Sequence, residues 1–329
     1  MNYRDKIFFD SDISLKGVQN RKIGVIGYGN QGRAQALNLK DSGLDVCVGL
    51  RRKSLSKNSV KNDGLRIINI SSLIKECDIV AIMIPDLEII SFFKKYLKMF
   101  SKNQTILLSH GYALVYGDFD VPKDINIAMV APSGGGGVVR SEYQKGFGVP
   151  ALVASYRNSS KESLQVAMSY AKAIGCSKAA VFLSTFKEEV ETDLFGEQVL
   201  LTGSIPMLII NSYKVLLEEG YSPIVSWFVC FYELRTIVDL MFQQGLNSFY
   251  DMISTTAKYG GLNAGKCLID EDFVSRIRKV LKNIKSGDFN KEFKKSLHGK
   301  TNVDSIQKEL LSSKELNQIE TLILKKFNS

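Results

Sequence analysis

The stretch KIGVIGYGNQGRAQALNL, residues 22–39, decides the fold. An apolar run of strand type ends at Gly27, and Gly27, Gly29 and Gly32 then form the pattern G-x-G-x-x-G at the start of a helical segment. The first glycine of such a loop permits a tight turn, the second lets the backbone approach a pyrophosphate, and the third lets the helix pack closely. The positive end of the helix dipole also favours phosphate there. The residues predicted to form this dinucleotide-binding loop are Gly27, Tyr28, Gly29, Asn30, Gln31 and Gly32.

Outward from this loop, short apolar runs alternate with longer amphipathic segments as far as about residue 183. Short runs of β-branched and apolar residues bounded by glycine, proline or aspartate predict buried strands, and the longer segments between them have helical spacing. The later strand signals are DVCVGL, IVAIMIP, TILLSH, INIAMVAP, ALVASY and AAVFL. Strands that alternate with helices predict a parallel, doubly wound sheet of Rossmann type.

Beyond residue 183 the strand signals stop. The remainder is helical by composition and contains only two prolines, Pro206 and Pro223. No flexible linker marks the boundary, so we expect the two parts to pack closely. The expected fold class is α/β, with an N-terminal Rossmann-type doubly wound sheet in residues 1–183 and an all-helical C-terminal domain in residues 184–329.

Composition indicates a soluble globular protein, because 45% of the 329 residues are hydrophobic and 23% are charged. The net charge of +9 could indicate a polyanionic partner, but the lysines are spread along the chain and thicken mainly near its end. A solvated lysine-rich surface explains the same count, so we expect no nucleic-acid partner. The five cysteines are widely separated and form no C-x-x-C pair, which favours a reducing compartment over a disulfide scaffold or a zinc site.

The beginning of the chain, MNYRDKIFFDSD, carries acids and has no apolar stretch of signal-peptide length. The longest uncharged stretch, QVLLTGSIPMLIINSY at residues 198–213, is shorter than a membrane span and contains Pro206. We therefore expect a cytoplasmic protein without a membrane partner, in which residues 198–213 form a buried helix.

The residues after the second strand indicate which dinucleotide binds. NAD enzymes place an acid at the end of this strand to bind the ribose 2′-hydroxyl. Here DVCVGL runs into RRKSLSK, which offers Arg51, Ser54 and Ser56 and contains no acid. Cations and hydroxyl groups suit a 2′-phosphate, so NADPH is favoured over NADH.

The segment EEVETDLFGEQ places Asp193 and Glu197 four residues apart, on one face of one helix. Two carboxylates at this spacing can share a hard cation such as magnesium. Taken alone, such a pair is more often a solvated acidic face than a metal site.

Several further segments change that balance: SHG at 109–111, MVAP at 129–132, GVPALVA at 148–154, YELRTIVDL at 232–240 and YDMISTTAKYG at 250–260. With GYGNQGRAQALNLKDSG and TFKEEVETDLFGEQ, they resemble a short-chain ketol-acid reductoisomerase over essentially the whole chain. The resemblance implies a Rossmann-type N-terminal domain, a knotted helical C-terminal domain, and a homodimer whose active sites combine residues from both chains. It also implies the family reaction, in which magnesium promotes alkyl migration in a 2-acetohydroxy acid and NADPH then reduces the resulting ketone.

The resemblance assigns roles position by position. It implies that Arg51, Ser54 and Ser56 read the phosphate, and that Pro85, His110 and Gly136 lie on the nicotinamide side. The remaining implied residues are metal ligands Asp193, Glu197 and Glu233, and catalytic residues His110, Glu233 and Ser254.

Two segments depart from the family pattern. Val229 stands where the family has the first of two glutamates four residues apart, so a second magnesium ion would lack a ligand. Ser133 stands where the family has a lysine, and Gly135 and Gly137 replace a proline and a histidine in a run of four glycines. We expect this run to form a roomier and more mobile loop beside the nicotinamide.

These departures leave three functions open. Alkyl migration needs stronger polarisation by metal than hydride transfer does, so the first hypothesis is an NADPH-dependent reductase of a small 2-oxo acid or related carbonyl or imine, with isomerisation weakened or lost and one magnesium retained. The second is an authentic reductoisomerase of branched-chain amino acid biosynthesis, helped by neighbouring carboxylates such as Glu188, Glu189 or Asp239. The third is a non-catalytic cofactor-binding paralogue.

Overall fold

The computed structural model describes residues 6–102, 104–122, 124–157, 161–298, 303–311 and 314–327. The chain divides into two compact units, Met1–Val190 and Glu191–Ser329, and each is described by itself. The division falls inside helix α8 (Phe186–Gly196), a few residues after the boundary expected from the end of the strand signals.

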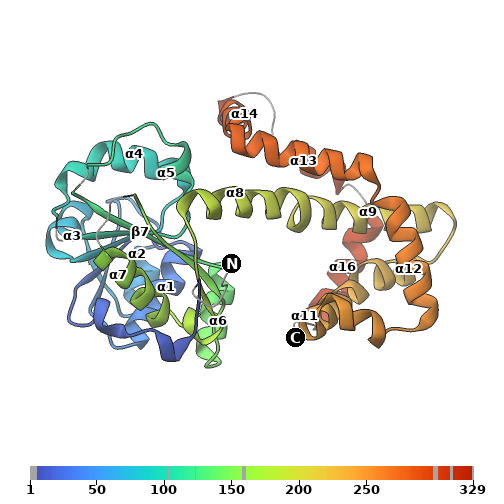
Figure 1. The fold of residues 1–329 in the computed structure, drawn as a ribbon, viewed down its shortest axis with the longest axis horizontal. Coiled ribbons are helices and arrows are strands. Elements are labelled where there is room, and N and C mark those ends of the chain that lie inside the picture. The colour runs from blue at the N-terminus through green and yellow to red at the C-terminus, as the bar shows by residue number, and fades with distance from the viewer. Residues whose placement is uncertain are drawn as a thin grey trace. The chain divides into compact units, whose positions relative to one another are not determined.

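The first unit is built on a nine-stranded sheet with helices on both faces (Figure 1). The strand order is β1-β9-β8-β7-β6-β5-β2-β3-β4, and neighbouring strands from β4 to β7 run parallel. The strands are β1 (Ile7–Phe8), β2 (Ile23–Ile26), β3 (Val46–Gly49), β4 (Arg66–Ile68), β5 (Ile79–Ile82), β6 (Thr105–Leu108), β7 (Asn126–Pro132), β8 (Ala151–Ser155) and β9 (Val181–Leu183).

The parallel part of the sheet has the classic Rossmann order, in which the chain steps outward from β2 in both directions. Strands β2, β3, β5 and β6 are buried along their whole length, which explains why they read as continuous apolar runs. The order reverses between β2 and β5, and ligands of doubly wound sheets bind at that reversal. The predicted Rossmann-type sheet is confirmed.

The edge of the sheet departs from the expected parallel pattern, because β8 runs antiparallel to β7 and β1 runs antiparallel to β9. After β7, the chain makes an excursion through α6 (Gly136–Gln144) and returns to the same end of the sheet. There the Ser133 amide donates to the Pro150 carbonyl at 2.8 Å, and β8 begins opposite Pro132. A strand that starts beside the end of its neighbour must run in the opposite direction.

Two apolar cores fill the faces of this sheet. One packs residues of α1 and α7, such as Leu39 and Tyr170, against the strands, and the other packs residues of α3 and α4, such as Leu73 and Phe93. The helices of the first unit are α1 (Asn30–Asp41), α2 (Lys57–Asn62), α3 (Ile70–Glu76), α4 (Asp86–Tyr96), α5 (Tyr112–Tyr116), α6 (Gly136–Gln144), α7 (Lys161–Ala173) and the start of α8.

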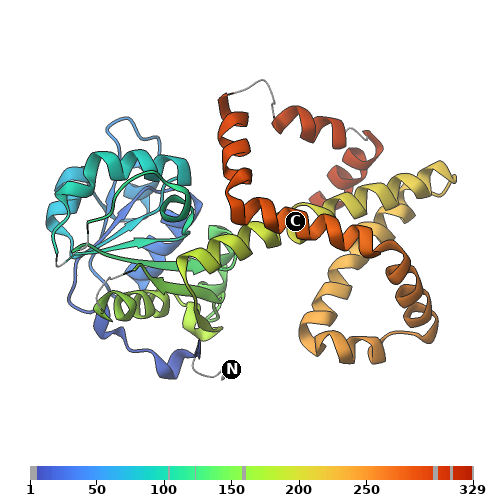
Figure 2. The same cartoon turned by 45° about the horizontal axis from the view of Figure 1, so that its top comes forward.

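The second unit is helical throughout its described residues (Figure 2). Its helices after α8 are α9 (Ser204–Glu218), α10 (Pro223–Trp227), α11 (Glu233–Met252), α12 (Thr255–Leu268), α13 (Glu271–Ser286), α14 (Asp288–His298), α15 (Val303–Leu310) and α16 (Lys314–Phe327). Two π-helical turns, Glu197–Leu201 and Phe228–Tyr232, precede α9 and α11, and α11 kinks at Gly245, whose φ is 75°. The predicted helical C-terminal domain is confirmed.

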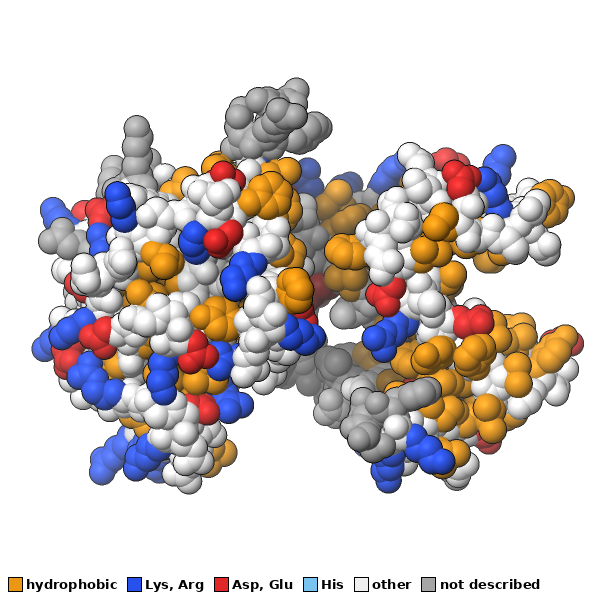
Figure 3. Space-filling view, turned by 90° about the horizontal axis from the view of Figure 1, so that it is seen from below, with side chains coloured by type: hydrophobic (Ala, Val, Ile, Leu, Met, Phe, Trp, Pro, Cys, Tyr) orange, Lys and Arg blue, Asp and Glu red, His pale blue; other side chains and the backbone are white. Residues whose placement is uncertain are grey.

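This unit buries few of its apolar side chains. A small core joins Tyr213 and Trp227 to Leu316 and Ile319 of α16, while large hydrophobic side chains remain exposed along α9, α10 and α11. Figure 3 shows such side chains gathered over the helical unit on the right of the view. The expectation of a buried helix at residues 198–213 is wrong for the single chain, because Leu200, Leu201 and Leu208 are more than half exposed.

One helical run, Phe186–Glu218, reaches the length and mean hydropathy (1.4) of a membrane span, and 11% of its most apolar window is buried. This likeness to a membrane span rests on length and composition alone, and the core helix of a soluble protein meets the same criteria.

Candidate active site

The glycine loop has the geometry that its sequence predicts. Gly27 has a φ of 96°, and a Cβ atom there would lie 2.4 Å from the Met83 carbonyl oxygen. A Cβ at Gly32 would lie 2.5 Å from the Gly27 carbonyl oxygen, so this glycine lets α1 pack against the loop. Beside Gly29, at the N-cap of α1, no atom lies within 4 Å of the ideal Cβ position. The loop therefore leaves open space at the position where a pyrophosphate approaches the helix N-terminus.

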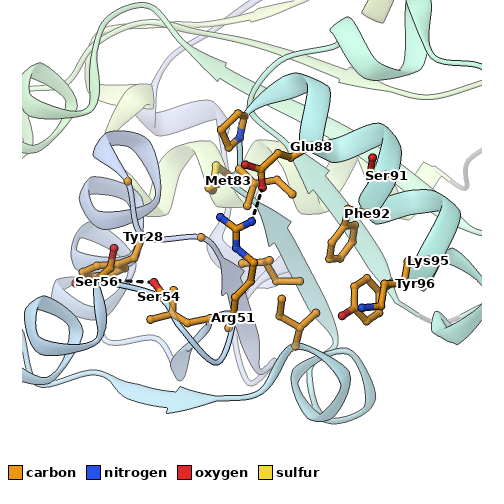
Figure 4. A pocket seen from close by; sticks show the side chains of 18 of the residues that line it. Tyr28, Arg51, Ser54, Ser56, Met83, Glu88, Ser91, Phe92, Lys95 and Tyr96 are labelled. Atoms are coloured by element: carbon orange, nitrogen blue, oxygen red, sulfur yellow. Dashed lines mark hydrogen bonds and ion pairs between the residues drawn. The ribbon is translucent and has the colours of Figure 1, made fainter.

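This open space belongs to a cavity of about 660 Å³, a size typical of ligand sites (Figure 4). One wall is the glycine loop with the end of β2, another is the segment after β3, and the third is α4. Seven of the predicted cofactor residues line it: Gly27, Tyr28, Gly29, Arg51, Ser54, Ser56 and Pro85. The cavity thus lies at the order reversal of the sheet and fits a dinucleotide.

The other predicted cofactor residues lie beside the cavity rather than in its lining. Asn30 and Gln31 begin α1, and Gly32 faces the loop backbone. Gly136 packs against α1 so closely that a Cβ atom would lie 2.0 Å from the Asn30 carbonyl oxygen. Its position fixes the spacing between the N-termini of α1 and α6.

Half of the glycine run is helical, whereas the sequence predicted a loop throughout. Gly134 has a φ of 140° and Gly135 is the N-cap, but Gly136 and Gly137 already belong to helix α6. The Gln31 side-chain amide donates to the Gly134 carbonyl at 2.8 Å, which ties the run to α1. Only the first half of the run is therefore loop.

A hydrogen-bonded chain of side chains supports that tie from the core. The Tyr170 hydroxyl donates to the Gln35 side-chain oxygen at 3.0 Å, and the Gln35 amide donates to the Gln31 oxygen at 3.0 Å. Tyr170 and Gln35 are fully buried. Because each member donates to the next, the chain fixes which way the Gln31 amide points.

A charged clamp holds the other side of the glycine loop. The Asp63 carboxylate accepts from the Tyr28 hydroxyl at 2.8 Å and from the Arg33 guanidinium at 2.8 and 2.9 Å. The Arg33 hydrogen bonds hold the pKa of Asp63 below its usual value, and burial raises the pKa of the Tyr28 phenol. Tyr28 is thereby kept protonated and fixed against the cavity.

A second polar group forms where the SHG segment meets α8. The Tyr112 amide donates to Nδ1 of His110 at 3.0 Å, so the proton of the neutral ring lies on Nε2. That Nε2 atom lies 3.9 Å from a carboxylate oxygen of Glu189. Glu189 is buried, and its other oxygen accepts from the Gly111 amide at 3.0 Å. Backbone amides thus fix His110 and Glu189 side by side.

Asp193 lies one helical turn beyond Glu189 on α8. One ligand atom from each of His110, Glu189 and Asp193 lies within 4.8 Å of the other two, so the three could hold a metal ion. Two carboxylates and an imidazole suit a divalent cation, although magnesium prefers oxygen ligands.

The remaining predicted residues lie elsewhere. Glu197 is exposed at the first position of the π-helical turn after α8, and Glu233 is exposed at the start of α11. Val229, which replaces a family glutamate, lies in the π-helical turn before α11 and is about half exposed. Ser254 caps α12, where its hydroxyl accepts from the Ala257 amide at 3.1 Å. Glu233 and Ser254 both belong to the second unit, and their roles stay predictions.

Sequence reasoning did not identify the third wall of the cavity. Glu88, Ser91, Phe92 and Lys95 line it from α4, together with Tyr96. Their spacing of three, four and seven residues places them on one helical face. That spacing was visible in the sequence, but nothing in it showed which face of the helix would meet a ligand.

Comparison with family models divides the chain as the structure does. Residues 17–180 match the model described as "Acetohydroxy acid isomeroreductase, NADPH-binding domain", and residues 186–327 match "Ketol-acid reductoisomerase, C-terminal domain". The two matches together span nearly all the described residues.

Individual relatives agree with these matches. The ketol-acid reductoisomerase (NADP(+)) of Methanocaldococcus jannaschii is 44% identical over 88% of each chain, and that of Sulfolobus acidocaldarius is 41% identical over 86% of each. A solved structure of an NADH-preferring ketol-acid reductoisomerase from an uncultured archaeon superposes with a TM-score of 0.90 and 32% identity, covering 97% of this chain and 98% of that one.

Proposed function

Because the chain belongs to the ketol-acid reductoisomerase family, it is an NADP-dependent oxidoreductase, and we propose that it is an authentic magnesium-dependent ketol-acid reductoisomerase. The observation that carries the proposal is the match of both halves of the enzyme, end to end, in one chain. The proposed reaction joins alkyl migration in a 2-acetohydroxy acid to reduction of the product ketone by NADPH, as a step in branched-chain amino acid biosynthesis.

The first hypothesis from the sequence, a reductase with weakened isomerisation, is not supported by the comparisons, which favour the authentic enzyme. That hypothesis rested on Val229 and Ser133, which depart from the family pattern. Relatives that bear the reductoisomerase name are 41–44% identical to this chain over most of its length. The buried Glu189 carboxylate beside His110 also gives the site an acid that lies near Asp193 without needing a residue at position 229.

We assign the cavity between the glycine loop and α4 to the cofactor. The glycine loop and the N-terminus of α1 would hold the pyrophosphate, and Arg51, Ser54 and Ser56 would hold the 2′-phosphate. The curated relatives carry NADP(+) in their names, whereas the solved relative prefers NADH. Cofactor choice in this chain therefore depends on its own cavity residues.

We assign magnesium to the carboxylates of α8, with Asp193 and Glu197 as ligands and Glu189 beside them. Bound magnesium supplies electrophilic polarisation of the substrate oxygens. His110 would present its Nε2 proton toward the same region, held in that tautomer by the Tyr112 amide. We infer one ion from these residues, with Glu233 and Ser254 reaching the site from a second copy of the chain.

The second copy is the occupant that we propose for the exposed apolar surface of α9, α10 and α11. Side chains such as Leu208, Val225 and Phe242 are 52%, 56% and 89% exposed in the single chain. Contiguous apolar surface on this scale is typical of obligate subunit interfaces. A homodimer would also bury the apolar run Phe186–Glu218 without a membrane.

The test follows NADPH oxidation at 340 nm with purified protein and magnesium. Authentic activity predicts oxidation with 2-acetolactate as well as with the already isomerised 3-hydroxy-3-methyl-2-oxobutyrate. Asp193→Asn should lower the rate with 2-acetolactate by about 100-fold or more while NADPH binding stays unchanged. Glu271→Gln, which removes an exposed acid of α13, is the matched control and should have no effect.

Two outcomes would contradict the proposal. Oxidation with the isomerised compound alone would identify a reductase that has lost isomerisation. If neither compound caused NADPH oxidation although NADPH binding was measurable, the protein would be a cofactor-binding paralogue.

A further inference from the structure

The phosphate-reading arginine is already paired across the cofactor cavity. Arg51 follows β3, and its guanidinium lies 3.3 Å from a carboxylate oxygen of Glu88, which belongs to the first turn of α4 on the opposite wall (Figure 4). The side chains are 75% and 45% exposed, so both can change partner without disturbing the core. A ligand that enters the cavity between these two walls therefore meets both charged groups.

Few charged side chains line the cavity that contains this pair. Among the described residues that line the cavity, Glu88 is the one acid, and Arg51 and Lys95 are the cations. Lys95 lies seven residues after Glu88 on the same face of α4, with its ammonium group over the Tyr96 ring. The acid is therefore next to Arg51, and the second cation lies two turns away.

The two nicotinamide cofactors meet this acid differently. A 2′-phosphate carries close to two negative charges, so it must take Arg51 from Glu88 and then remain near an uncompensated carboxylate. A 2′-hydroxyl carries no charge and can donate a hydrogen bond to a carboxylate. Repulsion by Glu88 and competition for Arg51 therefore act on NADPH and not on NADH.

We propose that Glu88 is a specificity-determining residue that lowers the preference for NADPH over NADH. This inference rests on the assignment of the cavity to the cofactor. Glu88 reaches from α4 toward the ribose position that an acid after the second strand serves in NAD enzymes, while Arg51, Ser54 and Ser56 supply the phosphate contacts. The cavity thus holds elements suited to each cofactor, and Glu88 sets the balance between them.

A different result is expected if Arg51 and Glu88 form only an ordinary exposed ion pair. Such pairs contribute little to stability and would change the binding of both cofactors equally or not at all. The measured quantity is therefore the selectivity, defined as the Kd of NADH divided by the Kd of NADPH.

The experiment titrates the intact protein with NADPH, NADH and 2′-phospho-ADP-ribose, following cofactor fluorescence or heat. Glu88→Gln keeps the shape of the side chain and removes its charge. NADPH and 2′-phospho-ADP-ribose should bind about threefold to fivefold more tightly, and NADH should change by less than about twofold. Because salt screens the repulsion, the gain should shrink at high ionic strength.

Two further variants separate the roles of the partners. Arg51→Gln should weaken NADPH about tenfold, and adding Glu88→Gln to it should recover part of that loss, because the carboxylate then no longer repels the phosphate. Glu76→Gln is the matched control, since Glu76 pairs with Arg66 at 3.8 Å on the surface and is absent from the cavity lining.

Equal selectivity in Glu88→Gln and Glu76→Gln, or weaker NADPH binding in Glu88→Gln, would overturn the inference. If the unaltered protein bound neither cofactor, the assignment of the cavity would fail instead. The two failures are thus distinguishable.

Discussion

The two units of the chain bury their apolar side chains to different extents. In the first unit, β2, β3, β5 and β6 are buried along their whole length, and helices cover both faces of the sheet. In the second unit, α9 has 15 residues, of which Ile210 and Tyr213 are the buried ones. The first unit encloses its core with its own elements, whereas the second presents apolar side chains outward.

This difference explains how function is distributed. The cofactor cavity lies wholly in the first unit, where tight packing fixes the glycine loop within the chain itself. Glu233 and Ser254 lie on exposed positions of the second unit. A cofactor site can thus be complete in one chain, while a site that needs those two residues depends on what covers the second unit.

The largest expected effect comes from placing a charge on the outward apolar face. Phe242→Asp in α11 alters a side chain that is 89% exposed in the single chain. If a second copy covers it, a buried unpaired carboxylate should weaken subunit association about 100-fold or more. Light scattering coupled to size exclusion should show monomers, and reductoisomerase activity should fall with dimerisation while NADPH binding persists.

The same change in the first unit provides the control. Phe147 is 65% exposed there, and Phe147→Asp should leave the oligomeric state and the activity unaltered. A Phe242→Asp protein that remains dimeric at low concentration would break the comparison, because the exposed face would then not be the subunit interface.

A smaller effect tests the close packing of the first unit at the glycine run. A Cβ atom at Gly136 would lie 2.0 Å from the Asn30 carbonyl oxygen and 2.8 Å from the Gln31 amide, and both are backbone atoms that cannot rotate away. Gly136→Ala should lower the free energy of unfolding by about 2–3 kcal/mol. It should also weaken NADPH binding, because Asn30 begins the helix under the cofactor loop.

Its neighbour gives the opposite expectation. Gly137 lies inside α6 and has no atom within 4 Å of its ideal Cβ position. Gly137→Ala should raise stability by about 0.5–1 kcal/mol, since alanine favours a helix. Urea denaturation midpoints measure both effects, and equal midpoints for the two variants would show that the contact between α1 and α6 is not tight.

The first unit was largely predictable from its sequence. Buried parallel strands such as β2 and β5 read as apolar runs, and the three glycines fixed the position of the cofactor loop. The antiparallel edge was not predictable, because the direction of β8 depends on where α6 returns the chain, and that is a long-range property. The expectation that the whole glycine run forms a loop was wrong in part, because Gly136 and Gly137 belong to α6 despite their low helix propensity, and Gly136 packs against Asn30.

The site was predictable where one local segment carries it. Residues of the glycine loop and Arg51 line the cavity as expected. Glu88 was missed because its role depends on a contact between segments 37 positions apart, Arg51 and Glu88, that no local pattern records. The metal and catalytic roles of residues in the second unit stay predictions, because such roles depend on long-range contacts that no local pattern in the sequence records.

A loss of stability smaller than that of Gly136→Ala is expected at the charged clamp beside Tyr28, where hydrogen bonds rather than close packing hold the loop. Asp63 is 15% exposed, and its hydrogen bonds to Arg33 hold its pKa below the usual value. A carboxyl group whose pKa is lower in the folded state stabilises the fold at pH values above its unfolded pKa of about 3.9, and this contribution is lost as the pH falls through the folded pKa.

Asp63→Asn should therefore lower the free energy of unfolding by about 1–2 kcal/mol at pH 7. The difference between the two proteins should shrink below about pH 4, where Asp63 takes up a proton first in the unfolded chain and, at still lower pH, in the folded protein. Asp124→Asn, which removes an exposed partner of Lys102, should change neither quantity. A difference that stays constant from pH 7 to pH 3 would mean that Asp63 acts through shape alone, and the clamp would then be packing like the rest of the first unit.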